Sequence, residues 1–157
     1  MSSGAMATQE ELREQLGGRP LLLFDGQCGF CHSSVQWLIR HDHRDRFRFA
    51  PQESQVATSV FHRHGINCAA LLKSNSIYMA VDAATDREQL LTQSDVSVNI
   101  LLELGGRWRV LGYLLRAVPK FLRDAAYRTF ARNRYRLGER YQACPVPTNA
   151  NRMKFIT

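Results

Sequence analysis

The residues of this chain whose types and spacing could do chemistry are two cysteines, Cys28 and Cys31, and the aspartate Asp25 shortly before them. Disulfide exchange needs an attacking thiolate and a second thiol close enough to resolve the mixed disulfide that forms. A spacing of three residues across the first turn of a helix brings two sulfurs within bonding reach. The C-x-x-C pair therefore predicts redox chemistry, with Cys28 as nucleophile and Cys31 as the resolving thiol.

Cys28 is the expected attacker because it lies at or beside the first residue of a predicted helix. A helix N-terminus carries unpaired N–H groups and about half a positive charge, which together favour a thiolate. C-x-x-C motifs at such positions bring the attacking thiol from a pKa of about 8.5 to roughly 7 or below. We expect Cys28 to be the more accessible sulfur and Cys31 to point back toward the sheet.

Asp25 ends the apolar run Leu21–Phe24, and two roles are open for its carboxyl. A carboxyl in an apolar place holds its proton more tightly, and Asp25 could then take the proton from Cys31 as that thiol attacks. It could also form an Asx-type turn by accepting hydrogen bonds from the amides of Gly26 and Gln27. The two roles are compatible.

A strand, a turn and a helix must position these three side chains. Four consecutive apolar residues, 21–24, indicate a strand buried on both faces, and apolar residues recur at helical spacing over 29–41. The alternating residues 47–51 predict a second strand, parallel to the first through a right-handed crossover. The elements expected next are a helix over 54–64, an antiparallel strand pair over 76–81 and 88–92, and a helix over 94–104. This order predicts a thioredoxin-like α/β fold, a four-stranded mixed sheet with helices on both faces.

The chain of 157 residues is expected to hold one core with additions at both ends. The expected parts are an N-terminal leader or flexible segment over 1–18, the thioredoxin-like core over 19–106, a basic helical extension over 107–141 and an extended tail over 142–157. Two helices are predicted in the extension, each with an apolar stripe that packs onto the core. The stripes consist of Leu111, Leu114, Leu115 and Val118, and of Leu122, Ala126 and Phe130.

The composition, 45% apolar and 22% charged, is that of a globular protein. No apolar run approaches the roughly 20 residues that span a bilayer, and the first residues lack the pattern of a signal peptide. We therefore expect no transmembrane segment and a cytoplasmic location.

The net charge of +7 is concentrated near the C-terminus, since residues 107–140 hold ten Lys/Arg and two acidic residues. The basic helices here could present a solvated face, a surface for a membrane or nucleic acid, or a docking site for an acidic partner, with Arg132, Arg134 and Arg136 as the candidate docking residues. No recognisable nucleic-acid-binding motif accompanies them, so nucleic acid is not an expected partner.

The other two cysteines, Cys68 and Cys144, lie far from the pair and from each other. A structural zinc site needs two further ligands, usually as a second close pair, so no metal is expected. No organic cofactor is expected either, because the sulfur pair itself carries the electrons. A packing role is predicted for both, with a third redox thiol at Cys144 left open.

Residues 25–31 resemble the D-x-x-C-x-x-C signature of the DCC family of thiol-disulfide oxidoreductases. The likeness spans roughly residues 21–147 and continues in 46–51, 94–95, 105–109 and 131–136. The resemblance implies a thioredoxin-like fold with a redox-active dithiol, and it assigns that role to Cys28 and Cys31 with Asp25 beside them. It implies a protein or small molecule that carries a thiol or disulfide as substrate.

One feature departs from the wider thioredoxin pattern. Those proteins place a cis-proline before the third strand, where it helps to hold the backbone of a substrate, whereas residues 73–76 contain no proline. Docking of a peptide by the usual strand-like pairing is therefore not expected. The alternative function is a non-enzymatic binding module that docks an acidic partner or anionic surface through its basic helices, with redox-sensing or relict cysteines.

Overall fold

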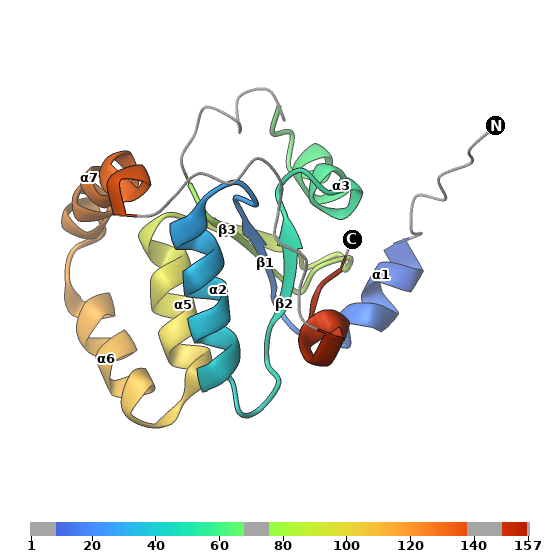
Figure 1. Cartoon of the computed structure of the whole chain (residues 1–157), viewed down its shortest axis with the longest axis horizontal. Helices are drawn as coiled ribbons and strands as arrows, with labels where there is room; N and C mark the ends of the chain where they lie inside the picture. The colour runs from blue at the N-terminus through green and yellow to red at the C-terminus, as the bar shows by residue number, and fades with distance from the viewer. Residues whose placement is uncertain (1–8, 68–75, 138–148, 157) are drawn as a thin grey trace.

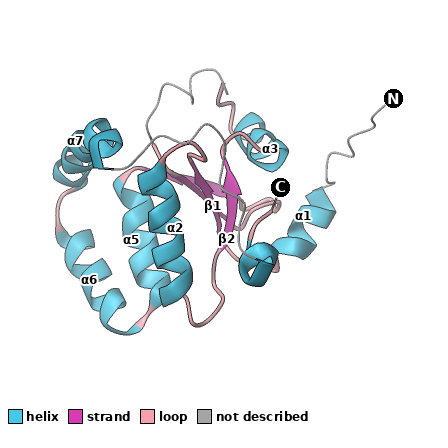
Figure 2. Cartoon of the chain, viewed as in Figure 1, coloured by secondary structure: helices cyan, strands magenta, loops and turns pink. Residues whose placement is uncertain are grey.

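The protein is a four-stranded mixed sheet with helices on both faces (Figures 1 and 2). The computed structural model describes residues 9–67, 76–137 and 149–156. Its elements are α1 (Gln9–Leu16), β1 (Leu21–Phe24), α2 (Gly29–His41), β2 (Arg48–Pro51), α3 (Gln55–Arg63), β3 (Tyr78–Val81), β4 (Gln89–Thr92), α5 (Ser94–Leu104), α6 (Gly106–Ala117), α7 (Lys120–Leu137) and the 3-10 helix η1 (Asn149–Lys154).

The strand order β2-β1-β3-β4 confirms the predicted thioredoxin-like arrangement. β1 pairs in parallel with β2 and antiparallel with β3, and β3 forms an antiparallel pair with β4. β1 lies inside the sheet, and all four of its side chains are buried. A strand buried on both faces tolerates only apolar residues, which explains the unbroken run that marks it in the sequence.

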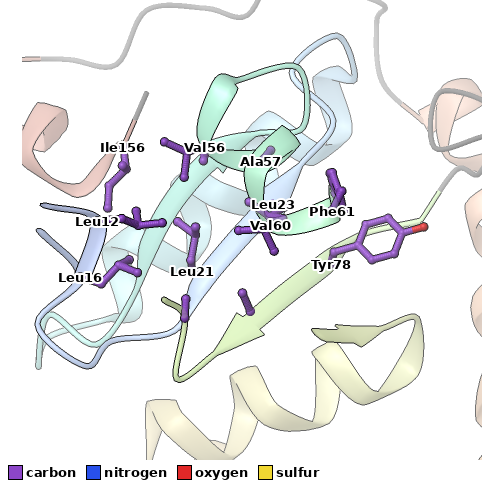
Figure 3. Close-up of a cluster of buried hydrophobic side chains, with 13 residues drawn as sticks. Leu12, Leu16, Leu21, Leu23, Val56, Ala57, Val60, Phe61, Tyr78 and Ile156 are labelled. Atoms are coloured by element: carbon purple, nitrogen blue, oxygen red, sulfur yellow. The ribbon is translucent and has the colours of Figure 1, made fainter. Parts of the chain in front are cut away.

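The sheet separates two apolar clusters, because alternate residues of β1 point to opposite faces. Leu21 and Leu23 lie on the face covered by α1 and α3 (Figure 3). Leu22 and Phe24 lie on the other face, under α2 and α5, with Phe47, Phe49 and Met79 around them. The cysteine pair lies on the same side of the sheet as α2, at the N-terminus of that helix.

The segments at both ends of the described chain pack on the core. Leu12 and Leu16 of α1 are buried in the first cluster, so the part of the expected leader from Gln9 onward is a docked helix. Near the C-terminus, where an extended tail was expected, η1 forms, and the Ile156 N–H then donates to the Phe49 carbonyl over 2.8 Å. Residues 1–8 and 138–148 lie outside the described residues.

The helical extension forms as two helices, α6 and α7, as predicted. α6 packs against α5, and Gly112 allows the close approach, since a Cβ there would lie 3.0 Å from Leu102 Cδ2. This packing turns Leu111, Leu114 and Val118 outward, where they are exposed. The prediction that the two apolar stripes pack onto the core is therefore wrong for these three residues, and also for Leu122 and Ala126 of the second stripe, which are exposed.

α7 lies across α2 and α5 and has contacts with both. Its first turn is attached to the start of α5 because Lys120 and Arg123 both pair with the Asp95 carboxylate. Near its middle, the ring of Phe130 packs edge-on against that of Phe30 on α2, with ring centroids 5.1 Å apart. These contacts place the last turns of α7 beside the N-terminus of α2.

Candidate active site

Cys28 occupies the N-cap of α2, directly after the turn that follows β1. The turn is closed by a hydrogen bond from the Cys28 N–H to the Asp25 carbonyl, 3.3 Å long. The Cys28 sulfur accepts the N–H of Cys31 over 3.3 Å, in the position where a side-chain oxygen usually caps a helix. The two thiols are not joined in a disulfide in this structure.

The surroundings of Cys28 favour its thiolate. A hydrogen bond from the Cys31 side chain contributes most to lowering the pKa of Cys28 to about 6. Burial acts in the opposite direction, whereas the Cys31 N–H and the Arg134 guanidinium lower the pKa further. A thiol with a pKa of about 6 is roughly nine-tenths ionised at pH 7, compared with about 3% for an ordinary thiol.

Cys31 holds its proton far more tightly than Cys28. Donation of its S–H to the Cys28 sulfur raises the pKa of Cys31 well above its usual range, and burial adds to this effect. The pair is thus divided into a thiolate at Cys28 and a protonated thiol at Cys31. This is the division of roles that attack and resolution require.

Arg134 of α7 joins the cysteine pair to Asp25. Its Nη1 donates to the Cys31 sulfur over 3.3 Å, and its Nη2 donates to Asp25 Oδ2 over 3.0 Å. Arg134 is only 4% exposed, so this cation acts close to the sulfurs with little screening by solvent.

Asp25 forms the predicted Asx-type turn, because its Oδ1 accepts the N–H of Gln27 over 3.0 Å. Its other oxygen is paired with the Arg134 guanidinium. The carboxyl therefore lies in an ionic environment, whereas the sequence had led us to expect an apolar one.

Both sulfurs are buried, which overturns the expectation that Cys28 is accessible. Cys28 is 1% exposed and Cys31 is 7% exposed. Arg134 of α7 contacts Cys31. Tyr127 of the same helix binds the backbone just before β3, where the Ile77 N–H donates to Tyr127 Oη over 3.0 Å. α7 thus contacts Cys31 through Arg134 and accepts a main-chain hydrogen bond beside the site through Tyr127.

The expectation that Arg134 belongs to a surface set with Arg132 and Arg136 is wrong. Arg132 and Arg136 are exposed, but Arg134 is buried in the site. Tyr127, Ala131 and Arg134 follow one another at spacings of four and three, so they share the face of α7 that turns inward. That spacing was the signal in the sequence that could have separated Arg134 from its neighbours.

Several residues that the sequence brought forward lie outside the described part of the chain, namely Cys68, Cys144 and residues 73–75. Residues 9–67, 76–137 and 149–156 contain no cis peptide bond. In the same residues, no three His, Cys, Asp or Glu side chains gather in a way that could hold a metal ion. None of the described helices is long and apolar enough to cross a membrane.

The fold and the cysteine pair at the N-cap of α2 define a thioredoxin-like protein with a C-x-x-C centre. The model of the DCC1-like thiol-disulfide oxidoreductase family matches residues 22–140, and the chain belongs to that family.

Two curated relatives are similar to the chain over most of its length. The uncharacterized protein YuxK of Bacillus subtilis is 29% identical over 143 residues, which cover 91% of this chain and 97% of that protein. A chloroplastic DCC family protein of Arabidopsis thaliana is 27% identical over 128 residues, which cover 82% of this chain and 70% of that protein. A comparison with solved structures gave no significant match.

Proposed function

We propose that this protein is a thiol-disulfide oxidoreductase that acts by dithiol-disulfide exchange, with Cys28 as nucleophile and Cys31 as the resolving thiol. One observation carries the proposal: the Cys28 sulfur caps α2 and is held as a thiolate by Cys31. Membership of the DCC1-like family supports a redox role in general. The individual roles of the two cysteines rest on the geometry of the site.

The reaction proceeds in two exchanges. The Cys28 thiolate attacks one sulfur of a substrate disulfide, which forms a mixed disulfide and releases the other substrate sulfur as a thiolate. The Cys31 thiol then loses its proton and attacks the Cys28 sulfur. The substrate leaves with both sulfurs reduced, and two electrons have passed from the protein, which now holds a Cys28–Cys31 disulfide. The same steps in reverse oxidise a dithiol substrate.

Arg134 and Asp25 act on the second exchange. Once Cys28 is in a mixed disulfide, it can no longer accept the Cys31 S–H, and the factor that most opposes ionisation of Cys31 is removed. The Arg134 guanidinium, 3.3 Å from the Cys31 sulfur, then stabilises the thiolate that forms. We propose Asp25 as the acceptor of the Cys31 proton, directly or through one water, because both groups contact the same guanidinium and the Asp25 charge acts on Cys31.

Burial of both sulfurs sets a condition on the substrate. A disulfide reaches Cys28 only when the side chains that bury the pair move aside, and Arg134 of α7 is one of the side chains in contact with Cys31. The substrates we propose are proteins or small molecules that carry a thiol or disulfide. The proposed setting is the cytoplasm, although one relative is chloroplastic by name.

Equilibration of the protein with mixtures of reduced and oxidised glutathione tests the proposal. We expect a reversible Cys28–Cys31 disulfide whose fraction follows the glutathione ratio, seen by mass spectrometry after the remaining thiols are alkylated. Cys28→Ser and Cys31→Ser are each expected to remove this equilibrium. A pair that stays reduced at every glutathione ratio would refute the proposed function.

A further inference from the structure

The outer surface of α6 and the first turn of α7 is apolar and open to solvent. Its exposed side chains are Val110, Leu111, Tyr113, Leu114, Val118, Phe121 and Leu122, which we call the α6–α7 face. Two of them protrude strongly, since Leu114 is 64% exposed and Phe121 is 69% exposed. Single exposed apolar residues are ordinary, but a contiguous group on two consecutive helices marks an interaction surface.

The α6–α7 face results from the way that α6 packs. Trp108, Gly112 and Leu115 lie at spacings of four and three residues, so they share the inner side of α6. Gly112 lies against Leu101 and Leu102 of α5, and Trp108 packs against Trp37 and His41 of α2. The apolar residues of the face lie on the opposite side of the helix. Figure 1 shows α6 at the edge of the molecule, beyond α5 and away from the sheet. α6 thus turns its more apolar side away from the core.

Positive charge surrounds the α6–α7 face. Six exposed arginines lie on the two helices: Arg107, Arg109, Arg116, Arg128, Arg132 and Arg136. Within the described residues, none of these six forms an ion pair with an Asp or Glu side chain. The single acidic residue of residues 106–137 is Asp124, which accepts a hydrogen bond from Ser94 on α5 and so does not neutralise the outer surface.

We propose that the α6–α7 face docks the protein on the surface of an anionic lipid bilayer. Protruding Leu, Val, Phe and Tyr side chains enter the boundary between headgroups and acyl chains, while the flanking arginines contact acidic headgroups. Neither helix is long and apolar enough to cross the bilayer, so both lie on its surface.

Charge argues against a second copy of the chain as the occupant of this face. Residues 106–137 contain nine Lys/Arg and one acidic residue, so two copies would bring like charges together. The combination of exposed apolar side chains with flanking arginines favours an anionic lipid surface over an acidic protein surface, because a lipid surface offers both an apolar interior and acidic headgroups.

Cosedimentation with vesicles tests the proposal. We expect the intact protein to bind vesicles that contain phosphatidylglycerol in phosphatidylcholine, and to bind pure phosphatidylcholine vesicles at least about tenfold more weakly. Leu114→Ser combined with Phe121→Ser is expected to weaken binding at least about tenfold, since it removes two inserted side chains. Arg128→Glu combined with Arg132→Glu should have an effect of similar size, and added salt should reduce binding by the parent.

Two matched controls lie elsewhere on the surface. Met153→Ser changes an exposed apolar side chain on η1, and Arg13→Glu changes an exposed cation on α1, so neither should alter binding. Cys28→Ser is also expected to bind like the parent, because docking does not depend on the dithiol. Failure of the redox function therefore leaves the docking proposal intact, and the reverse is also true.

Three results would overturn the proposal. The first is that the intact protein binds neither kind of vesicle, or binds both equally. The second is that Leu114→Ser with Phe121→Ser leaves binding unchanged while the variant keeps its glutathione equilibrium. The third is that light scattering shows a dimer that these two substitutions dissociate, which would make the face an interface between copies of the chain.

Discussion

Replacing Cys31 by alanine should raise the pKa of Cys28. The hydrogen bond from the Cys31 side chain is the largest of the factors that bring the pKa of Cys28 to about 6. A hydrogen bond to a charged group is worth about 1.5–3 kcal/mol, and one pKa unit corresponds to about 1.4 kcal/mol. We therefore expect Cys31→Ala to raise the pKa of Cys28 by roughly one to two units. At pH 7 the thiolate fraction then falls from about nine-tenths to between about half and one-tenth.

Cys31→Ser is the matched control for this substitution. The serine hydroxyl still donates a hydrogen bond, so the pKa of Cys28 should stay near that of the parent. Both variants keep the main-chain N–H of residue 31, which caps the helix through the Cys28 sulfur. The difference between the two variants therefore isolates the side-chain hydrogen bond from the effect of the helix N-terminus.

The assay is a pH titration of thiolate absorbance, with the signal of Cys28→Ser subtracted to remove the contributions of other cysteines. The pH dependence of the alkylation rate gives a second measure of the same ionisation. If Cys31→Ala titrates near 6 like the parent, the hydrogen bond does not set the pKa of Cys28. If Cys31→Ser shifts as much as Cys31→Ala, the donor is not the cause. Either result would refute the reasoning.

Arg134→Met should slow resolution of a mixed disulfide at least about tenfold and affect the first attack by Cys28 less, which rapid-mixing experiments would measure. Arg132→Met, at an exposed position, is the control, and equal slowing by that variant would contradict the prediction. The pKa of Cys28, about 6 in the folded protein, is lower than that of an ordinary thiol, about 8.5. The reduced protein should therefore gain stability as pH rises from about 6 toward 8.5, and lose it as pH falls through 6. Urea unfolding should show a weaker pH dependence for Cys28→Ser. Glu88→Ala should cost about 3 kcal/mol in the same assay, because it leaves the part-buried Arg63 without the carboxylate that pairs with it over 2.6 Å; a loss below about 0.5 kcal/mol would contradict this.

The core of the fold could be predicted from the sequence because its signals are local. The unbroken apolar run of β1 follows from burial on both faces, and the helical spacing after Gly29 follows from packing on one face. Helix α2 connects β1 to β2, and a strand–helix–strand unit of this kind makes its two strands parallel neighbours. The N-cap position of Cys28 follows from the same local pattern.

The site could be predicted only in part because Arg134, which contacts Cys31, comes from far along the chain. The contact between Arg134 and Cys31 joins residues 103 positions apart, and no local pattern encodes it. The spacing of Tyr127, Ala131 and Arg134 marks one face of α7, but only the tertiary position of the helix shows that this face meets the cysteine pair. For the same reason the apolar stripe of α6 indicated an amphipathic helix but not which side would face α5.

The most direct test of the account is to trap the first intermediate. Cys31→Ser keeps the attacking thiolate but cannot resolve a mixed disulfide, so it should accumulate one covalent adduct with oxidised glutathione, or with a natural substrate in cell extract. Peptide mapping is predicted to place that adduct on Cys28, and Cys28→Ser is predicted to form no comparable adduct at pH 7. An adduct on Cys31 in Cys28→Ser at the same rate, or none on Cys28 in Cys31→Ser, would contradict the claim that Cys28 is the nucleophile.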